Sequence, residues 1–232
     1  MSSLLVLNGS PRGPRSNSMR MLTPVAEGWK HAGAPEPEVL HLARPGDFER
    51  AVERFPRADT VLLGMPLYTD AMPALVKLYI EALAPCLESA SQGDVKPTLG
   101  FLVQSGFEEA LHSRPLERYL QKLARRLGSP YAGTIVRGSG WSLQVTSENE
   151  NRALVTHLRA LGEQLARDRC FSEAELRAVA GTERFSPTAA AWLSLAFSLP
   201  AAIPNSYLDR QMEKNGVWDR RYAAPYAAAL PT

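Results

Sequence analysis

Short apolar runs recur along this chain, and each is followed by a segment with helical periodicity. The five runs are Leu4–Leu7, Val39–Leu42, Thr60–Gly64, Thr98–Gln104 and Gly133–Arg137. Apolar runs of this length are typical of strands that are buried on both faces of a parallel sheet. We therefore expect an α/β fold in which a five-stranded parallel sheet carries helices on both faces.

Helical segments fill the intervals between these runs. They cover about residues 16–32, 48–55, 73–83, 115–127 and 149–167, and the last places four leucines on one face. Beyond Phe171 the pattern changes to two or three helices without a strand. The sequence thus predicts a domain over residues 1–170 and a helical C-terminal extension over residues 171–232.

Charge and cysteine content narrow the classes of function. The chain of 232 residues has 26 basic and 24 acidic residues, a balance that favours neither a nucleic-acid binder nor a strongly acidic electron shuttle. Cys86 and Cys170 lie too far apart in sequence to form a close-spaced iron–sulfur or zinc motif, so we predict no metal site, although a disulfide stays open. Without a signal-peptide pattern or a membrane-length apolar stretch, the expected location is the cytoplasm.

The loop after the first apolar run is rich in glycine, serine and arginine. It reads Asn8-Gly9-Ser10-Pro11-Arg12-Gly13-Pro14-Arg15-Ser16-Asn17-Ser18 and leads into a predicted helix. The free N–H groups and the dipole at a helix start favour an anion. The loop lacks the glycine spacing of triphosphate and dinucleotide sites, so it suits a phosphate monoester. The alternative is an ordinary helix N-cap in a turn rich in serine and glycine.

Two further loops follow the third and fourth runs, at the edge where ligands of open α/β sheets bind. The segment Pro66-Leu67-Tyr68 combines a stiff backbone with an aromatic ring, which could hold a planar ligand. The segment Ser105-Gly106-Phe107 contains a glycine that permits close approach of a ligand. Tyr68 could equally pack at a turn, and the last segment could be a tight strand-to-helix connection.

With these three loops in order, the chain from Leu4 to about residue 140 resembles the flavodoxin-like NADPH-dependent FMN reductase family. The resemblance is carried by Leu7-Asn8-Gly9-Ser10-Pro11-Arg12 with Ser16-Asn17-Ser18, by Ala58-Asp59-Thr60-Val61, by Pro66-Leu67-Tyr68 and by Pro73-Ala74-Leu75-Val76-Lys77. It implies a flavodoxin-like three-layer fold with strand order 2-1-3-4-5. The third loop departs from the glycine pair of many relatives, and the cysteine motif of related iron–sulfur flavoproteins is missing.

The resemblance implies flavin mononucleotide (FMN) as the cofactor. Its phosphate would be held by Ser10, Arg12, Ser16, Asn17 and Ser18, and its isoalloxazine ring would contact Pro66, Leu67 and Tyr68, with Ser105, Gly106 and Phe107 closing the other side. The expected reaction passes hydride from NADPH or NADH through FMN to a small acceptor, such as a quinone, flavin, nitro or azo compound. We predict no catalytic residue, because the flavin carries the hydride chemistry, and we expect the four dispersed histidines to be surface or packing residues.

Other functions and assemblies stay open from the sequence. The alternatives are a non-enzymatic flavodoxin-like electron carrier and a flavin-binding scaffold. Members of the family that the chain resembles are commonly dimers or tetramers, which implies a homodimer or homotetramer, without nucleic acid or membrane as a partner. The apolar stretch from Pro187 to Leu199 would pack on a neighbouring subunit or on its own domain, with membrane-surface attachment as a third option. Information on the acceptor is expected around Phe107, Trp141 and the C-terminal tail.

Overall fold

A computed structural model describes residues 3–84, 96–144, 146, 148–198, 212–220 and 223. The chain divides into two compact units, Met1–Arg184 and Phe185–Thr232. Cys86 lies outside the described residues, and with it the disulfide that the sequence leaves open, whereas Cys170 is an exposed free thiol. The first unit holds the sheet and the predicted site.

Five parallel strands form a single sheet in the first unit. They are β1 (Leu4–Asn8), β2 (Glu38–His41), β3 (Thr60–Pro66), β4 (Thr98–Gln104) and β5 (Tyr131–Arg137), and their order is β2-β1-β3-β4-β5. The predicted fold class and strand order are thus confirmed. Because the chain moves from β1 outward to β2 and then returns to the other side of β1, the switch point lies between β1 and β3, where ligands of such sheets bind.

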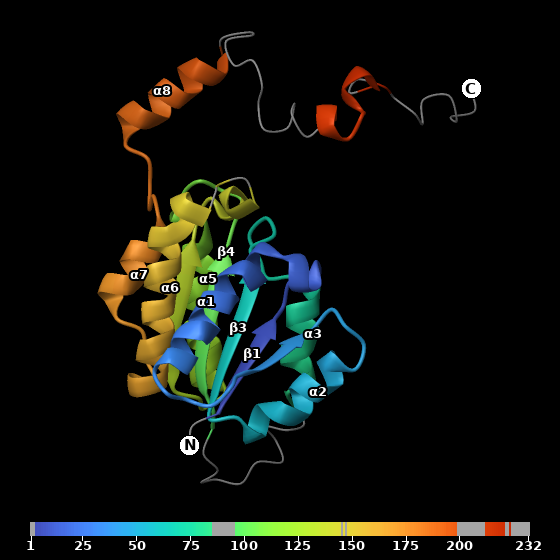
Figure 1. Ribbon diagram of the computed structural model, residues 1–232, viewed down its shortest axis with the longest axis vertical. Coiled ribbons are helices and arrows are strands. Elements are labelled where there is room, and N and C mark those ends of the chain that lie inside the picture. Colours follow the sequence, from blue (N-terminus) through green and yellow to red (C-terminus); the bar gives the residue numbers. More distant parts are fainter. Residues whose placement is uncertain are drawn as a thin grey trace, which may run out of the picture. The chain divides into compact units, whose positions relative to one another are not determined.

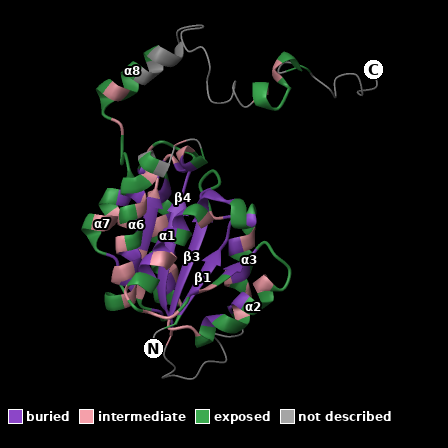
Figure 2. Cartoon of the chain, in the orientation of Figure 1, coloured by how far each residue is buried: buried purple, intermediate pink, exposed green. Residues whose placement is uncertain are grey.

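Helices cover both faces of this sheet (Figure 1). One face carries α1 (Asn17–His31), α6 (Glu148–Asp168) and α7 (Glu173–Ala180), and the other carries α2 (Asp47–Arg54), α3 (Ala74–Ala82) and α5 (Arg114–Arg126). Short 3₁₀ helices occupy the connections η1 (Gly13–Arg15), η2 (Phe55–Arg57), η3 (Ala110–Ser113) and η4 (Gly140–Gln144). The layered arrangement buries the three central strands, β1, β3 and β4, at every residue, as Figure 2 shows.

Alternation along the strands divides the core into two halves. In β1, Leu5 and Leu7 join the cluster beneath α2, α3 and α5, whereas Leu4 and Val6 join the cluster beneath α1, α6 and α7. Successive strand side chains point to opposite faces, and both faces here are covered. This double burial explains why the strands are continuously apolar in sequence.

Helices α1 and α6 approach each other closely through glycine. A Cβ on Gly28 would lie 1.9 Å from the carbonyl oxygen of Arg159, and one on Gly162 would lie 2.0 Å from that of Val25. No side chain fits at either position, so the two helix backbones pack directly against each other. The contact holds α1, whose first turn borders the predicted phosphate loop, in a fixed position.

The first unit extends beyond the domain boundary that we predicted after residue 170. Phe171 is buried against the sheet, and its N–H donates to the carbonyl oxygen of Ala132 (2.8 Å). Helix α7 then packs on α6 and β5. The predicted limit therefore falls inside the first unit, because Phe171 and helix α7 pack against the sheet layer after the last strand.

The second unit contains the apolar helix α8 (Pro187–Ser198) and the short η5 (Trp218–Arg220). Trp192 and Leu195 of α8 are 73% and 55% exposed in the single chain. The homodimer or homotetramer and the role of this segment stay predictions. Of the helices within the described ranges, none has both the length and the apolar character that a bilayer crossing requires.

Candidate cofactor site

The buried side chain of Asn8, at the end of β1, organises the predicted phosphate loop. Its amide nitrogen lies 2.8 Å from the carbonyl oxygen of Gly13, which can only accept, and its Oδ1 lies 3.1 Å from the backbone nitrogen of Ser10, which can only donate. These two partners fix the orientation of the amide. The amide nitrogen is also 3.2 Å from Ser16 Oγ and 3.1 Å from His41 Nδ1. One side chain thus ties both ends of the loop to the neighbouring strand.

The start of α1 faces this loop with free donors. Ser16 is the N-cap, and its hydroxyl oxygen accepts from the N–H of Met19 (3.1 Å). Among the described residues, no hydrogen bond is formed by the N–H groups of Asn17 and Ser18, the first two residues of the helix. Arg12 is exposed beside them. Unpaired N–H groups at a helix start and an adjacent guanidinium are the features of an anion site.

Pro66 and Leu67 form the second wall, where β3 ends. Leu67 is buried, and its N–H donates to the carbonyl oxygen of Gln104 at the end of β4 (2.8 Å). Tyr68 and Ala71 then exchange backbone hydrogen bonds (3.0 and 3.1 Å) across a tight turn. The turn leaves the Tyr68 side chain 48% exposed, so the ring stands at the surface of a rigid loop rather than in the core.

The third loop, after β4, splits the predicted residues between structure and surface. Ser105 is buried, with its N–H donating to the Arg137 carbonyl oxygen (3.0 Å) and its own carbonyl oxygen accepting from Gly140 (2.7 Å). Gly106 is exposed, and a Cβ there would meet no atom within 4 Å. Phe107 is also exposed and packs on the His112 ring, with centroids 4.4 Å apart.

The carboxylate of Glu108 joins this loop to the segment after β5. One oxygen accepts from Trp141 Nε1 (2.9 Å), and the other contacts the hydroxyl of Ser139. The N–H of Ser139 also donates to the Phe107 carbonyl oxygen (2.6 Å). Burial lowers the pKa of the nearby Arg137, and the Glu108 charge offsets part of this effect. Glu108 thereby holds the exposed Trp141 ring in one orientation.

Two glutamines connect this side of the site to the phosphate loop. Gln144 Nε2 donates to Asn17 Oδ1 (2.9 Å), and Gln104 Nε2 lies 3.5 Å from Ser18 Oγ. A Cβ on Gly140 would lie 2.0 Å from Gln104 Oε1, so η4 passes directly over this glutamine. The loops after β1, β4 and β5 therefore form one hydrogen-bonded frame.

An open cavity of about 260 Å³ lies between these loops. Seven of the predicted site residues line it: Ser10, Arg12, Asn17, Pro66, Leu67, Tyr68 and Gly106. The other four do not line it. Ser16 caps α1, Ser18 and Ser105 are buried behind the loops, and Phe107 packs on His112. The structure therefore brings together, around one cavity, predicted residues from three loops that are far apart in sequence.

Gln104, Trp141 and Gln144 also line the cavity, although they were not among the predicted ligands. Gln104 is the last residue of β4, so its position at a strand end was a usable signal. Gln144 reaches Asn17 across 127 residues, a contact for which the sequence carries no local pattern. His41, expected to be a surface or packing histidine, is buried and belongs to the Asn8 network.

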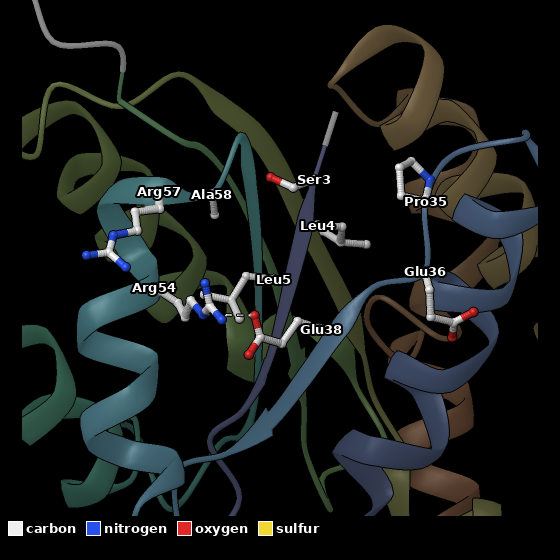
Figure 3. A pocket seen from close by; sticks show the side chains of 9 residues that line it. All are labelled: Ser3, Leu4, Leu5, Pro35, Glu36, Glu38, Arg54, Arg57 and Ala58. Atoms are coloured by element: carbon white, nitrogen blue, oxygen red, sulfur yellow. Dashed lines mark ion pairs between the residues drawn. The ribbon is translucent and has the colours of Figure 1, made fainter. Parts of the chain in front are cut away.

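A second cavity, of about 220 Å³, lies at the opposite, amino edge of the sheet (Figure 3). There the carboxylate of Glu38 pairs with Arg50 (2.6 Å) and Arg54 (3.3 Å), so its charge is compensated within the protein. Among the described residues, it is the carboxyl edge that combines the free N–H groups of a helix start with a topological switch point. We therefore assign the candidate site to the carboxyl edge.

Comparisons with known proteins agree with this geometry. Residues 2–85 match the model of a family described by its flavodoxin-like fold. The chain has a flavodoxin-like fold. This confirms the flavodoxin-like fold that the resemblance implies. None of the curated proteins with which the chain was compared is a significant match.

Solved structures with this flavodoxin-like fold include several reductases. An NAD(P)H:quinone oxidoreductase from Methanothermobacter marburgensis shares 19% identity, with a TM-score of 0.54, over 71% of this chain and 98% of that one. An FMN-dependent NADH-azoreductase from Bacillus anthracis, in complex with FMN, shares 13% identity, with a TM-score of 0.52, over 72% and 100%. An NADPH-quinone reductase from P. pentosaceus shares 17% identity, with a TM-score of 0.51, over 72% and 99%. At these identities the likeness establishes the fold.

Proposed function

We propose that this chain is an FMN-dependent oxidoreductase that passes hydride from NADPH or NADH to a small acceptor, such as a quinone, flavin, nitro or azo compound. The observation that carries the proposal is the cavity at the carboxyl edge, which combines a helix start with unpaired N–H groups at one end and apolar and aromatic walls at the other. A phosphate ester attached to a planar ring has this same division into a charged end and an apolar end.

The polar end fits the FMN phosphate. Arg12 and the hydroxyl of Ser10 line the cavity next to the free N–H groups of Asn17 and Ser18. Together they offer charge, a hydroxyl and backbone donors, which is a suitable donor set for a phosphate monoester. Ser16 supports the site indirectly, because its hydroxyl is already used to cap α1 and to bind Asn8.

The apolar end fits the isoalloxazine ring. Leu67 and Tyr68 lie on one loop, and Trp141 lies on another. Gly106 is exposed and also lines the cavity, so its backbone is within reach of a ligand. Flavin supplies the hydride chemistry when bound, so the protein needs to bind the ring, orient it and admit nicotinamide and acceptor in turn. The half-exposed rings of Tyr68 and Trp141 offer flat surfaces on which such planar molecules can stack.

Spectroscopy of the purified protein with FMN tests this proposal. Binding should quench flavin fluorescence, and anaerobic addition of NADPH or NADH should then bleach the yellow absorbance within minutes. Subsequent addition of a quinone should restore the absorbance. A bound flavin that stays oxidised with both nicotinamides would contradict the enzyme proposal. A stabilised one-electron reduced form in the same experiment would instead favour the electron carrier.

A further inference from the structure

The hydrogen-bond network behind the phosphate loop contains a titratable group. His41 is the last residue of β2, lies directly opposite Asn8 in the sheet register and is only 9% exposed. Its Nδ1 lies 3.1 Å from the amide nitrogen of Asn8. The imidazole therefore contacts Asn8, the first residue of the loop that would hold the phosphate.

The protonation state of this imidazole follows from the partners of Asn8. The amide nitrogen must point toward Gly13 and His41, because the amide oxygen is occupied by the N–H of Ser10 on the other side. An N–H donor thus faces His41 Nδ1, which has to accept with a lone pair. One amide hydrogen is directed to the Gly13 carbonyl oxygen, and the other is shared between Ser16 Oγ (3.2 Å) and His41 Nδ1 (3.1 Å). A neutral imidazole with its proton on Nε2 offers the lone pair that this contact needs.

Resting on the proposed function, we propose that neutral His41 is a positioning residue for the cofactor phosphate, acting through Asn8. Protonation of Nδ1 would place two N–H donors face to face and remove the acceptor from Asn8. Asn8 would then lose one of the contacts that hold it against the Ser10 and Gly13 backbone. The loop would lose its shape for phosphate as the imidazole gains its proton.

The surroundings of His41 favour the neutral form. Burial, and then the neighbouring Arg44, lowers the pKa of His41 from its ordinary value of 6.5, and Asp47 partly offsets this effect. Asp47 is itself engaged, because its carboxylate accepts from the His41 backbone N–H (3.0 Å). The groups on the β1 side, Asn8 and Ser16, are uncharged. A histidine whose pKa is lowered by folding contributes stability above pH 6.5 and loses it as the pH falls through the folded-state pKa.

FMN affinity as a function of pH tests the proposal. For the full chain, the dissociation constant from flavin fluorescence should rise between pH 7.5 and pH 5 by about fivefold more than in His41→Asn, a loss comparable to one neutral hydrogen bond. The asparagine variant offers an oxygen to Asn8 that does not titrate. The FMN phosphate, whose second pKa is about 6, titrates in the same way with both proteins, so its own effect cancels in the comparison. Riboflavin, which lacks the phosphate, should show no step in either protein.

Two outcomes would overturn this assignment. One is an identical pH profile in the natural chain and in His41→Asn. The other is tighter FMN binding at low pH, the sign expected if the imidazolium acts on the phosphate by simple charge attraction. In the FMN-free chain, the side-chain amide resonances of Asn8 should shift with the titration of His41, and their failure to do so would contradict the contact itself. If FMN does not bind even at pH 7.5, the proposed function fails, while the resonance test still judges His41.

Discussion

The phosphate end and the ring end of the candidate site are built in different ways. At the phosphate end, Asn8 reaches Gly13 and Ser16, only a few residues away, and one more distant residue, His41. At the ring end, the exposed rings of Tyr68 and Trp141 come from distant loops, and Trp141 is oriented by Glu108 across 33 residues. Gln104 and Gln144 join the two ends, but Asn8 shapes the phosphate end and Glu108 orients the ring end through separate contacts. A site divided in this way can keep one cofactor while its substrate side varies.

The strongest test of the phosphate end is Asn8→Ala. The change leaves the Ser10 N–H and His41 Nδ1 without their partner in a buried region, while the Gly13 carbonyl oxygen keeps its hydrogen bond from the Ser16 N–H (3.1 Å). Each buried group that loses its hydrogen bond costs about 1–3 kcal/mol, so we expect a loss of about 3 kcal/mol in the free energy of unfolding. Urea denaturation of the FMN-free protein measures it.

A matched control for this change is Asn151→Ala. To the described residues, the Asn151 amide makes one long hydrogen bond, 3.5 Å, which the carbonyl oxygen of Thr146 accepts. Its removal should alter the unfolding free energy by no more than about 0.5 kcal/mol. Equal effects of the two substitutions would show that Asn8 does not organise the loop.

Much of the phosphate end could be predicted because its determinants are close in sequence. The predicted strand from Leu4 to Leu7 matches β1 to within one residue, and the helix predicted from residue 16 begins at Asn17 with Ser16 as its cap. Apolar runs fix buried strands, and a serine before a helical segment fixes its start. Each of these signals spans only a few residues, so it can be read from the sequence before the fold is known.

The ring end could be predicted only in part, because it depends on the register between distant strands. Gln104 and Arg137 lie opposite each other in β4 and β5, and this pairing brings η4 and Trp141 over the cavity. No sequence pattern relates Glu108 to Trp141 or Gln144 to Asn17. The contact between His41 and Asn8 was missed for the same reason, since it depends on the register of β1 against β2.

The cofactor contact at the phosphate end can be separated from its architecture with Arg12→Ala. Arg12 is exposed and lines the cavity, so its loss should leave stability unchanged and weaken FMN binding. A charge-assisted hydrogen bond contributes about 1.5 kcal/mol or more, which is about tenfold in the dissociation constant. Fluorescence titration with FMN and with riboflavin measures it, and only FMN should respond.

Arg15 provides the comparison for this experiment. It is the other exposed arginine of the loop, but it does not line the cavity. We expect Arg15→Ala to weaken FMN binding by at most about threefold, through long-range charge that salt screens. If the two variants lose FMN affinity by the same factor, Arg12 acts as a general positive charge, and the proposed direct contact between Arg12 and the phosphate is contradicted.

The smallest effect is expected at the ring end, from Glu108→Ala. The change releases Trp141 Nε1 and the Ser139 hydroxyl without touching the phosphate loop. These contacts are exposed, so the loss is about 0.5–1 kcal/mol, or two- to fivefold in the acceptor KM. FMN affinity should stay within about twofold.

Trp141→Phe, which removes the N–H and keeps an aromatic ring, should reproduce the KM effect if orientation of the ring is its cause. A change in FMN affinity as large as the change in KM would mean that the two ends are coupled through Gln144 and Asn17, and the division of the site into separate ends would not hold.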